Sequence, residues 1–176
     1  MTQQFTAYSD GSCDNLHPKR PGGAAYIIFD KDGQEVKRAS KGFMGTSNNR
    51  MEILAIMSIV NSLPPLSSVT IYSDSQYSIN VLSGKWKASE NLDQIKRYKG
   101  ICLTKNIKVN FVWVRGHNGN QYNELCDQMA RNEYNKMRKT ASKVKKKAKH
   151  LPSNVLEEQY YRQITTKRGR KKTKRK

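Results

Sequence analysis

The chain has 176 residues, of which 36% are hydrophobic, and a formal net charge of +19 at pH 7. This length can supply one domain with an ordinary core and leave some residues over for a tail. No stretch contains the ~18 consecutive apolar residues of a membrane span. The N-terminal MTQQFTAYSD has no charged segment followed by an apolar one, so no secretory signal is evident. We expect a cytoplasmic monomer with no membrane association.

Positive charge is concentrated at the C-terminal end of the sequence. Residues 136–176 hold 17 Lys and Arg against 2 Glu, so 15 of the 19 net positive charges lie there. Counterion release makes nucleic acid the first candidate partner, and the segment lacks the apolar face of a membrane-surface helix. We predict a domain over residues 1–137 and a basic, largely disordered tail over 138–176, with a short helix at 153–164. A nuclear targeting signal or a solubilising segment is the alternative interpretation of the tail.

The cysteines exclude two kinds of structural crosslink. Cys13, Cys102 and Cys126 are odd in number and form no CxxC pair. This pattern argues against a disulfide framework and against a structural zinc site. We expect three small, half-buried side chains in a reducing compartment.

The first part of the chain predicts an antiparallel meander. A strand alternates at period two and runs into a turn at residues 10–12, and a break at residues 21–23 precedes the second strand. Asp32-Gly33 is a hairpin signal before the third strand. The predicted strands cover residues 5–9, 24–29 and 35–42.

From Asn48 onward the hydrophobic period becomes helical. Small and apolar residues share one helix face until Pro64-Pro65, namely Met51, Leu54, Ala55, Ser58, Ile59 and Ser62. Strands are predicted at 69–73 and 107–114, and helices at 75–82, 92–104 and 122–137, with Leu92 and Ile95 on the inner side. The order β-β-β-α-β-α-α-β-α predicts an α/β fold with a mixed five-stranded sheet flanked by helices.

Four carboxylates are candidates for one shared site. Asp10 and Asp74 each follow a predicted strand, where open α/β sheets place their ligands. Glu52, near the start of a helix, and Asp127, inside the last helix, can point at the same spot. Four clustered negative charges repel one another unless cations lie among them, and oxygen ligands suit Mg²⁺ or Mn²⁺. A single Asp after a strand, taken alone, is more often an ordinary turn or cap residue.

Four strings carry a family resemblance, in order along about 135 residues. They are SDGSC at 9–13, TSNNRME at 46–52, SDSQY at 73–77, and VWVRGHNGN with NELCDQMA between 112 and 130. Together they resemble type 1 ribonuclease H, the RNase HI family. The resemblance implies a ribonuclease H-like fold. It also implies an endonuclease that cuts the RNA strand of RNA/DNA hybrids with two Mg²⁺ ions, Mn²⁺ being the alternative, and leaves 5′-phosphate and 3′-hydroxyl ends.

The same resemblance assigns roles to individual residues. Asp10, Glu52, Asp74 and Asp127 are implied to be the metal ligands, with Asp10 bridging both ions and Glu52 also orienting the attacking water. His117, in the RGHNGN loop, is implied to be a mobile histidine that assists product release or moves a proton. A histidine in such a loop is usually without function when nothing else singles it out.

Substrate contacts are implied for short polar side chains and one tryptophan, which would distinguish the strands by the 2′-hydroxyl. The residues are Cys13, Asn15, Ser47, Asn48, Asn49, Gln76 and Trp86. Asn48 is also a candidate N-cap of the helix that carries Glu52. Gly45 stands where relatives often have an arginine for a DNA phosphate, and the loop at 14–20 differs from the usual glycine-rich form, which weakens the match at Asn15.

One departure from the family pattern concerns affinity for the substrate. Many bacterial members carry a basic helical handle after the tryptophan, whereas only residues 87–91 intervene here. We expect the basic tail to replace it by binding nucleic-acid phosphates. Two other functions stay open: a hybrid-binding module without catalysis, and another nuclease of the same fold, such as an integrase or resolvase. The presence of all four acids argues against the first, and NNRME and SDSQY argue against the second.

Overall fold

The computed structural model describes residues 2–148. The chain divides into two compact units, Met1–Arg138 and Lys139–Lys176. The first unit contains the whole sheet and all the candidate site residues. The short helix predicted at 153–164 lies outside the described residues.

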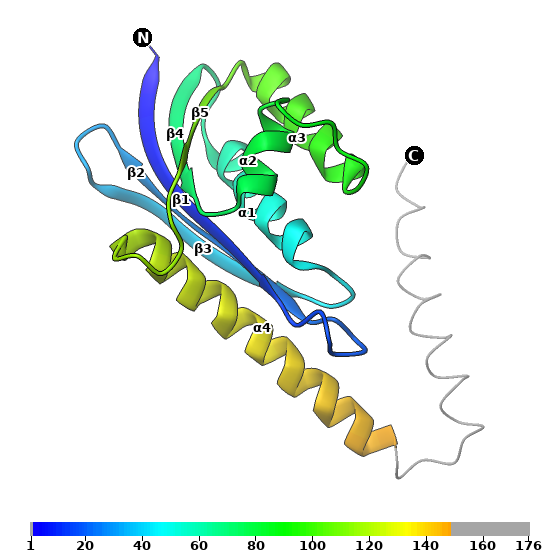
Figure 1. Cartoon of the computed structure of the whole chain (residues 1–176). Helices are drawn as coiled ribbons and strands as arrows, with labels where there is room; N and C mark the ends of the chain where they lie inside the picture. Colours follow the sequence, from blue (N-terminus) through cyan, green and yellow to red (C-terminus); the bar gives the residue numbers. More distant parts are fainter. Residues whose placement is uncertain (1, 149–176) are drawn as a thin grey trace, which may run out of the picture. The chain divides into compact units, whose positions relative to one another are not determined.

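The first unit is built on one mixed sheet (Figure 1). Its strands are β1 Gln3–Cys13, β2 Gly22–Asp30, β3 Glu35–Phe43, β4 Ser67–Ser73 and β5 Lys108–Trp113, in the spatial order β3-β2-β1-β4-β5. β1, β2 and β3 pair antiparallel, whereas β4 pairs parallel with both β1 and β5. The predicted five-stranded mixed sheet is therefore confirmed.

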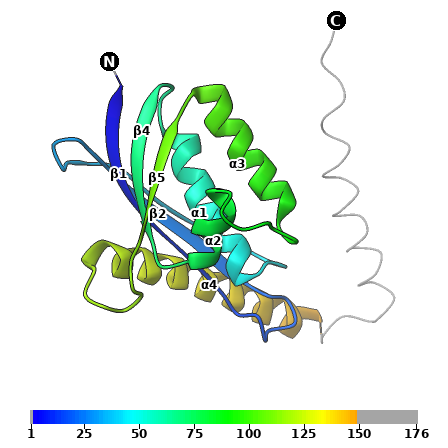
Figure 2. The same ribbon diagram turned by 45° about the horizontal axis from the view of Figure 1, so that its top comes forward.

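Helices cover both faces of the sheet. They are α1 Asn48–Ser62, α2 Gln76–Leu82, α3 Leu92–Lys105 and α4 Gln121–Ala148. Figures 1 and 2 show α1, α2 and α3 on one face and α4 across the other. β2 is buried between these layers, because Ile28 packs with the α1 side and Ile27 packs with Cys126 of α4. The sheet accordingly separates the large cluster on the α1 side from the cluster against α4, and a third, small cluster joins β2 to the start of α1.

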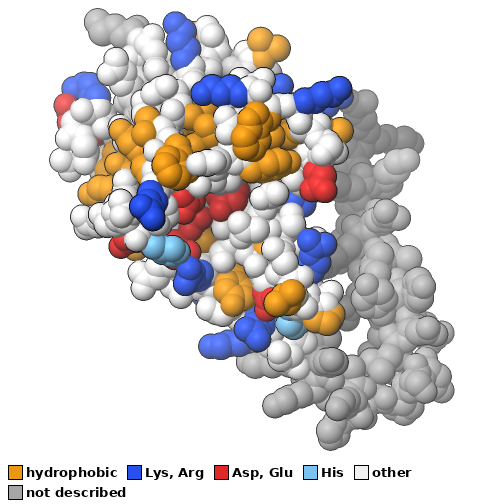
Figure 3. All heavy atoms as spheres, in the orientation of Figure 1, with side chains coloured by type: hydrophobic (Ala, Val, Ile, Leu, Met, Phe, Trp, Pro, Cys, Tyr) orange, Lys and Arg blue, Asp and Glu red, His pale blue; other side chains and the backbone are white. Residues whose placement is uncertain are grey.

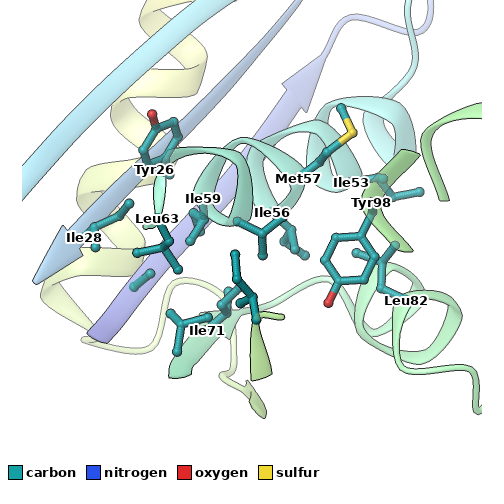
Figure 4. Packing of buried hydrophobic residues seen from close by; sticks show 14 of the residues in the cluster. Tyr26, Ile28, Ile53, Ile56, Met57, Ile59, Leu63, Ile71, Leu82 and Tyr98 are labelled. Atoms are coloured by element: carbon teal, nitrogen blue, oxygen red, sulfur yellow. The ribbon is translucent and has the colours of Figure 1, made fainter. Parts of the chain in front are cut away.

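The larger cluster is centred on α1 (Figure 4). Ile53, Ile56 and Ile59 are all fully buried, and each such side chain contributes about 1.5–3 kcal/mol by leaving water. The predicted one-sided stripe on α1 is too narrow, because this helix contacts the sheet as well as α2 and α3. The prediction that Leu92 faces inward is wrong, since its side chain is 57% exposed and Gln94 is buried instead.

The end of the first strand also differs from the prediction. Residues 10–12 do not form a turn; they continue β1, in which Asp10 pairs with Ala25 of β2. The glycines at 22 and 23, which suggested a break, are the first residues of β2. A Cβ atom at Gly23 would overlap the carbonyl oxygen of Ala130 in α4. Glycine is needed there for the close approach of a helix, and sequence alone does not distinguish this need from a turn.

Two helix ends require correction. α1 is capped by Ser47, whose side-chain oxygen accepts a hydrogen bond from the Arg50 N–H at 3.3 Å, so Asn48 is the first helical residue and not the N-cap. α4 continues beyond Met137 to Ala148. Its lysine-rich continuation carries alanines and few helix-breaking residues, so helical propensity is retained where charge suggested disorder.

Two further features of the described residues concern the cysteines and the helices. Cys13, Cys102 and Cys126 are free, although Cys126 is fully buried and not half-buried as predicted. None of the helices within residues 2–148 has the length and apolar character that crossing a bilayer requires.

Candidate metal centre

Three of the four acids converge at one edge of the sheet. Asp10 lies in β1, Asp74 follows β4, and Glu52 lies in the second turn of α1. β1 and β4 are parallel neighbours with Tyr8 opposite Tyr72, so two residues further along Asp10 comes level with Asp74. Carboxylate oxygens of Asp10, Glu52 and Asp74 all lie within 4.8 Å of one another.

Glu52 reaches this edge because α1 packs directly on β1. Gly11 faces the backbone of Met51 and Glu52, and a Cβ atom at position 11 would overlap that backbone. The Gly11 N–H also donates a hydrogen bond to Asp10 Oδ1 at 2.8 Å. The glycine of the SDGSC string therefore brings α1 close to the sheet and orients one carboxylate.

Burial raises the pKa of two carboxyl groups in the cluster. Asp10 is 5% exposed and Glu52 is 4% exposed. Burial, followed by the nearby charges of Asp74 and Asp127, raises the pKa of Asp10 from 3.8 to about 8. Burial and the charges of Asp10 and Asp74 also raise the pKa of Glu52 well above its usual range. Without a compensating cation, the folded site thus retains protons near neutral pH.

The donor set fits a hard divalent cation. All candidate ligands are carboxylate oxygens, the kind that Mg²⁺ and Mn²⁺ prefer. Glu52 Oε2 is buried and lacks a hydrogen-bond partner in the described structure, and such an orphaned acceptor is costly unless something binds it. Figure 3 shows acidic side chains gathered on one face beside a histidine. The predicted metal-ligating chemistry is therefore feasible at this edge.

Asp127 lies beside the cluster but is held by other partners. It projects from α4, and its charge raises the pKa of Asp10. Its Oδ1 accepts a hydrogen bond from Arg131 Nε at 2.8 Å. Its Oδ2 lies 4.0 Å from His117 Nδ1, while Arg131 Nη2 lies 3.4 Å from His117 Nε2. The structure thus brings three predicted ligands together and places the fourth with the predicted histidine and an arginine.

The sequence analysis missed two residues at this site. Asn123 is 2% exposed, and its Nδ2 lies 3.5 Å from Asp74 Oδ2. Asn123 and Arg131 stand four residues before and after Asp127, so all three lie on one face of α4. This spacing was readable in the sequence, and it is the signal that could have identified both residues.

The predicted substrate residues lie at or next to the ends of helices and strands. Cys13 ends β1 and Asn15 follows it, Ser47 caps α1, Asn48 and Asn49 begin α1, Gln76 begins α2, and Trp86 follows α2. Asn15 and Gln76 are exposed, and the Trp86 side chain is 50% exposed. The tryptophan is therefore not a core residue.

The fold and this donor set are compatible with an enzyme that uses divalent cations to hydrolyse phosphodiesters. The sequence profile of the RNase H family matches residues 2–135. Over 142 residues the chain is 36% identical to Ribonuclease HI of Haemophilus influenzae, covering 74% of this chain and 90% of that protein. Ribonuclease HI of Pasteurella multocida is 37% identical over 142 residues with the same coverage. The chain belongs to the RNase H family, as the four strings predicted.

Solved structures share the fold. The N-terminal RNase H domain of a Mycobacterium tuberculosis protein superposes with a TM-score of 0.68 at 16% identity, covering 80% of this chain and 99% of that one. RNase H1 of Halobacterium salinarum gives a TM-score of 0.63 at 17% identity, covering 76% and 98%. The predicted ribonuclease H-like fold is confirmed by these likenesses. Family membership confirms the predicted enzyme class, a metal-dependent ribonuclease H that acts on RNA/DNA hybrids.

Proposed function

We propose that this protein is an endonuclease that hydrolyses the RNA strand of RNA/DNA hybrids with two Mg²⁺ ions and leaves 5′-phosphate and 3′-hydroxyl ends. The observation that carries the proposal is the convergence of Asp10, Glu52 and Asp74 oxygens within 4.8 Å at the sheet edge. Asp127, whose charge acts on Asp10, completes the proposed ligand set.

The protein's part in the reaction follows from burial and charge. The cations would be held by Asp10, Glu52, Asp74 and Asp127. Asp10 interacts with each of the other three acids, so it would be a ligand of both cations. When bound, the ions lower the barrier to phosphodiester hydrolysis by activating water and stabilising the leaving oxygen. The unpartnered Oε2 of Glu52 is a free acceptor that can orient the water.

His117 has the exposure that a transient proton carrier or release aid requires. Its side chain is 68% exposed, and it sits in the loop between β5 and α4. It faces the Asp127 carboxylate, so that carboxylate can orient the ring. We assign His117 to product release or proton transfer at the leaving group.

Strand choice is proposed to come from short polar side chains at helix starts. Asn48 and Asn49 open α1, and Gln76 opens α2, so their amides lie close along the chain to Glu52 and Asp74. Amide groups can donate to and accept from a 2′-hydroxyl, which only the RNA strand carries. Cys13, Asn15 and Ser47 extend this polar rim, and Trp86 offers a face against the DNA strand.

The basic tail is proposed to supply general affinity for phosphates. Residues 138–176 carry 16 Lys and Arg against 2 Glu. If about 6 of these cations contact phosphates, affinity falls about a thousandfold between ~50 and ~200 mM salt. Monomeric assembly and a cytoplasmic location stay predictions, as does Mg²⁺ as the metal, with Mn²⁺ as the alternative.

Cleavage of three end-labelled duplexes tests the proposal. The substrates are an RNA/DNA hybrid and the RNA/RNA and DNA/DNA duplexes of the same sequence, each with Mg²⁺ or with EDTA. We expect internal cuts in the hybrid's RNA strand alone, with fragments that a ligase accepts through their 5′-phosphates. Cuts in the DNA/DNA duplex would favour a different nuclease of this fold, and hybrid binding without cleavage in Mg²⁺ or Mn²⁺ would favour a binding module.

A further inference from the structure

The four carboxylates of the site are not in equivalent surroundings. Asp10, Glu52 and Asp74 bring oxygens within 4.8 Å of one another, and none of them forms an ion pair with Lys or Arg within the described residues. Asp127 forms one with Arg131, at 2.8 Å between Oδ1 and Nε. Within the described residues, three ligands thus have no positive side-chain partner, whereas the fourth pairs with an arginine.

Arg131 holds one of the two carboxylate oxygens of Asp127. The guanidinium Nε–H points at Oδ1, and Nη2 of the same group lies 3.4 Å from His117 Nε2. The Asp127 side chain is 19% exposed, so its charge is partly removed from water and a close positive partner matters more than on an open surface. The i,i+4 spacing places Arg131 next to Asp127 on the surface of α4.

We propose that Arg131 is a positioning residue that balances the charge of Asp127 until a second divalent cation displaces it. The first cation enters the site of Asp10, Glu52 and Asp74 without disturbing any ion pair. A second cation that binds Asp127 meets the positive charge of Arg131 at Oδ1, so its affinity is lower and the two ions bind in sequence. This inference rests on the proposed function, because it takes Asp127 as a metal ligand.

The displacement has a consequence for the histidine. Arg131 lies against both Asp127 and His117, so loss of the ion pair also frees the imidazole from the guanidinium. Occupancy of the second cation site and release of the histidine loop are therefore coupled events.

Titration of the full-length protein with Mn²⁺ alone, followed calorimetrically in the absence of nucleic acid, tests the inference. Wild type should bind the first Mn²⁺ ion more tightly than the second. Arg131→Gln should tighten the second binding event by roughly three- to fivefold, the range expected for an ion pair of this exposure, and leave the first within error. Arg131→Lys, which keeps the charge, should behave as wild type. The exposed Arg97 of α3 gives the control Arg97→Gln, which removes an equal charge elsewhere.

The possible results distinguish failure of the role of Arg131 from failure of the proposed ligand set. An equal change in Arg131→Gln and Arg97→Gln, or no change in either, would overturn the role of Arg131. Asp127→Asn should abolish the second binding event; if it does not, the proposed ligand set fails and the inference with it. Arg131→Ala provides a second variant with the same expectation should Arg131→Gln melt early. In cleavage assays the Mg²⁺ concentration for half-maximal rate should fall in Arg131→Gln and stay unchanged in Arg131→Lys.

Discussion

Replacing Asp10 by asparagine should stabilise the protein when no divalent cation is present. Asparagine keeps the size of the side chain and an oxygen that can accept the Gly11 N–H, but it cannot ionise. Asp10 is only 5% exposed, and burial with the charges of Asp74 and Asp127 raises its pKa from 3.8 to about 8. The folded wild type is therefore destabilised at any pH where Asp10 is ionised in the unfolded chain but protonated in the folded one.

The sign and size follow from the two pKa values. Between pH 3.8 and about 8 the unfolded chain releases this proton while the folded chain keeps it, so the free energy of unfolding falls as pH rises through that window. At pH 7 this spans roughly 3 units at about 1.4 kcal/mol each, or about 4 kcal/mol. Because the pKa of Glu52 is also raised and depends on the charge of Asp10, we expect a smaller effect, on the order of 2 kcal/mol, which is roughly 4–8 °C in Tm.

Thermal unfolding in EDTA at pH 7 and pH 4, followed by circular dichroism, measures this difference. Asp10→Asn should melt above wild type at pH 7, and the gap should close toward pH 4. Addition of Mg²⁺ should raise the Tm of wild type more than that of the variant, because the cation binds only the folded site. Asp32→Asn, in the exposed β2–β3 turn, is the matched control and should not show this pattern. A variant no more stable than wild type at pH 7 would refute the electrostatic reasoning.

Three further predictions concern packing and substrate. Gly11→Ala should lower the free energy of unfolding by about 1–3 kcal/mol and weaken Mn²⁺ binding, because the new methyl group pushes α1 from β1; equal Mn²⁺ affinity would contradict the packing account. Truncation after Ala148 should raise the Kd for hybrid and flatten its salt dependence without moving the cut sites; an unchanged slope in a filter-binding titration would exclude the tail as a nucleic-acid arm. Trp86→Ala should leave Tm within about 2 °C and raise KM; a large drop in Tm would indicate a structural role instead.

The order of elements was predictable because hydrophobic period and turn residues act locally. The change from alternating to helical spacing at Asn48 identified α1, and Asp32-Gly33 identified the hairpin between β2 and β3. The errors fall where tertiary packing overrides local preference. Gly11 and Gly23 suggest turns in the sequence, yet both lie inside strands because helices approach the sheet there. Local patterns do not contain that information.

The site was predictable to the extent that the motifs name its acids. The strings around Asp10, Glu52 and Asp74 predicted a shared site, and their oxygens do converge. The state of Asp127 was not predictable from its string, because its pairing with Arg131 depends on side-chain conformations on α4. The environment of Asn123, buried beside Asp74, likewise depends on how α4 crosses the sheet.

Single-turnover cleavage of an end-labelled RNA/DNA hybrid by wild type, Asp10→Asn and Asp32→Asn tests the central claim most directly. With Mg²⁺, wild type and Asp32→Asn should cut the RNA strand at equal rates. Asp10→Asn should bind the hybrid but show no cleavage, and EDTA should stop all three proteins. Full activity of Asp10→Asn, or cleavage that continues in EDTA, would contradict a metal-dependent ribonuclease H centred on this carboxylate.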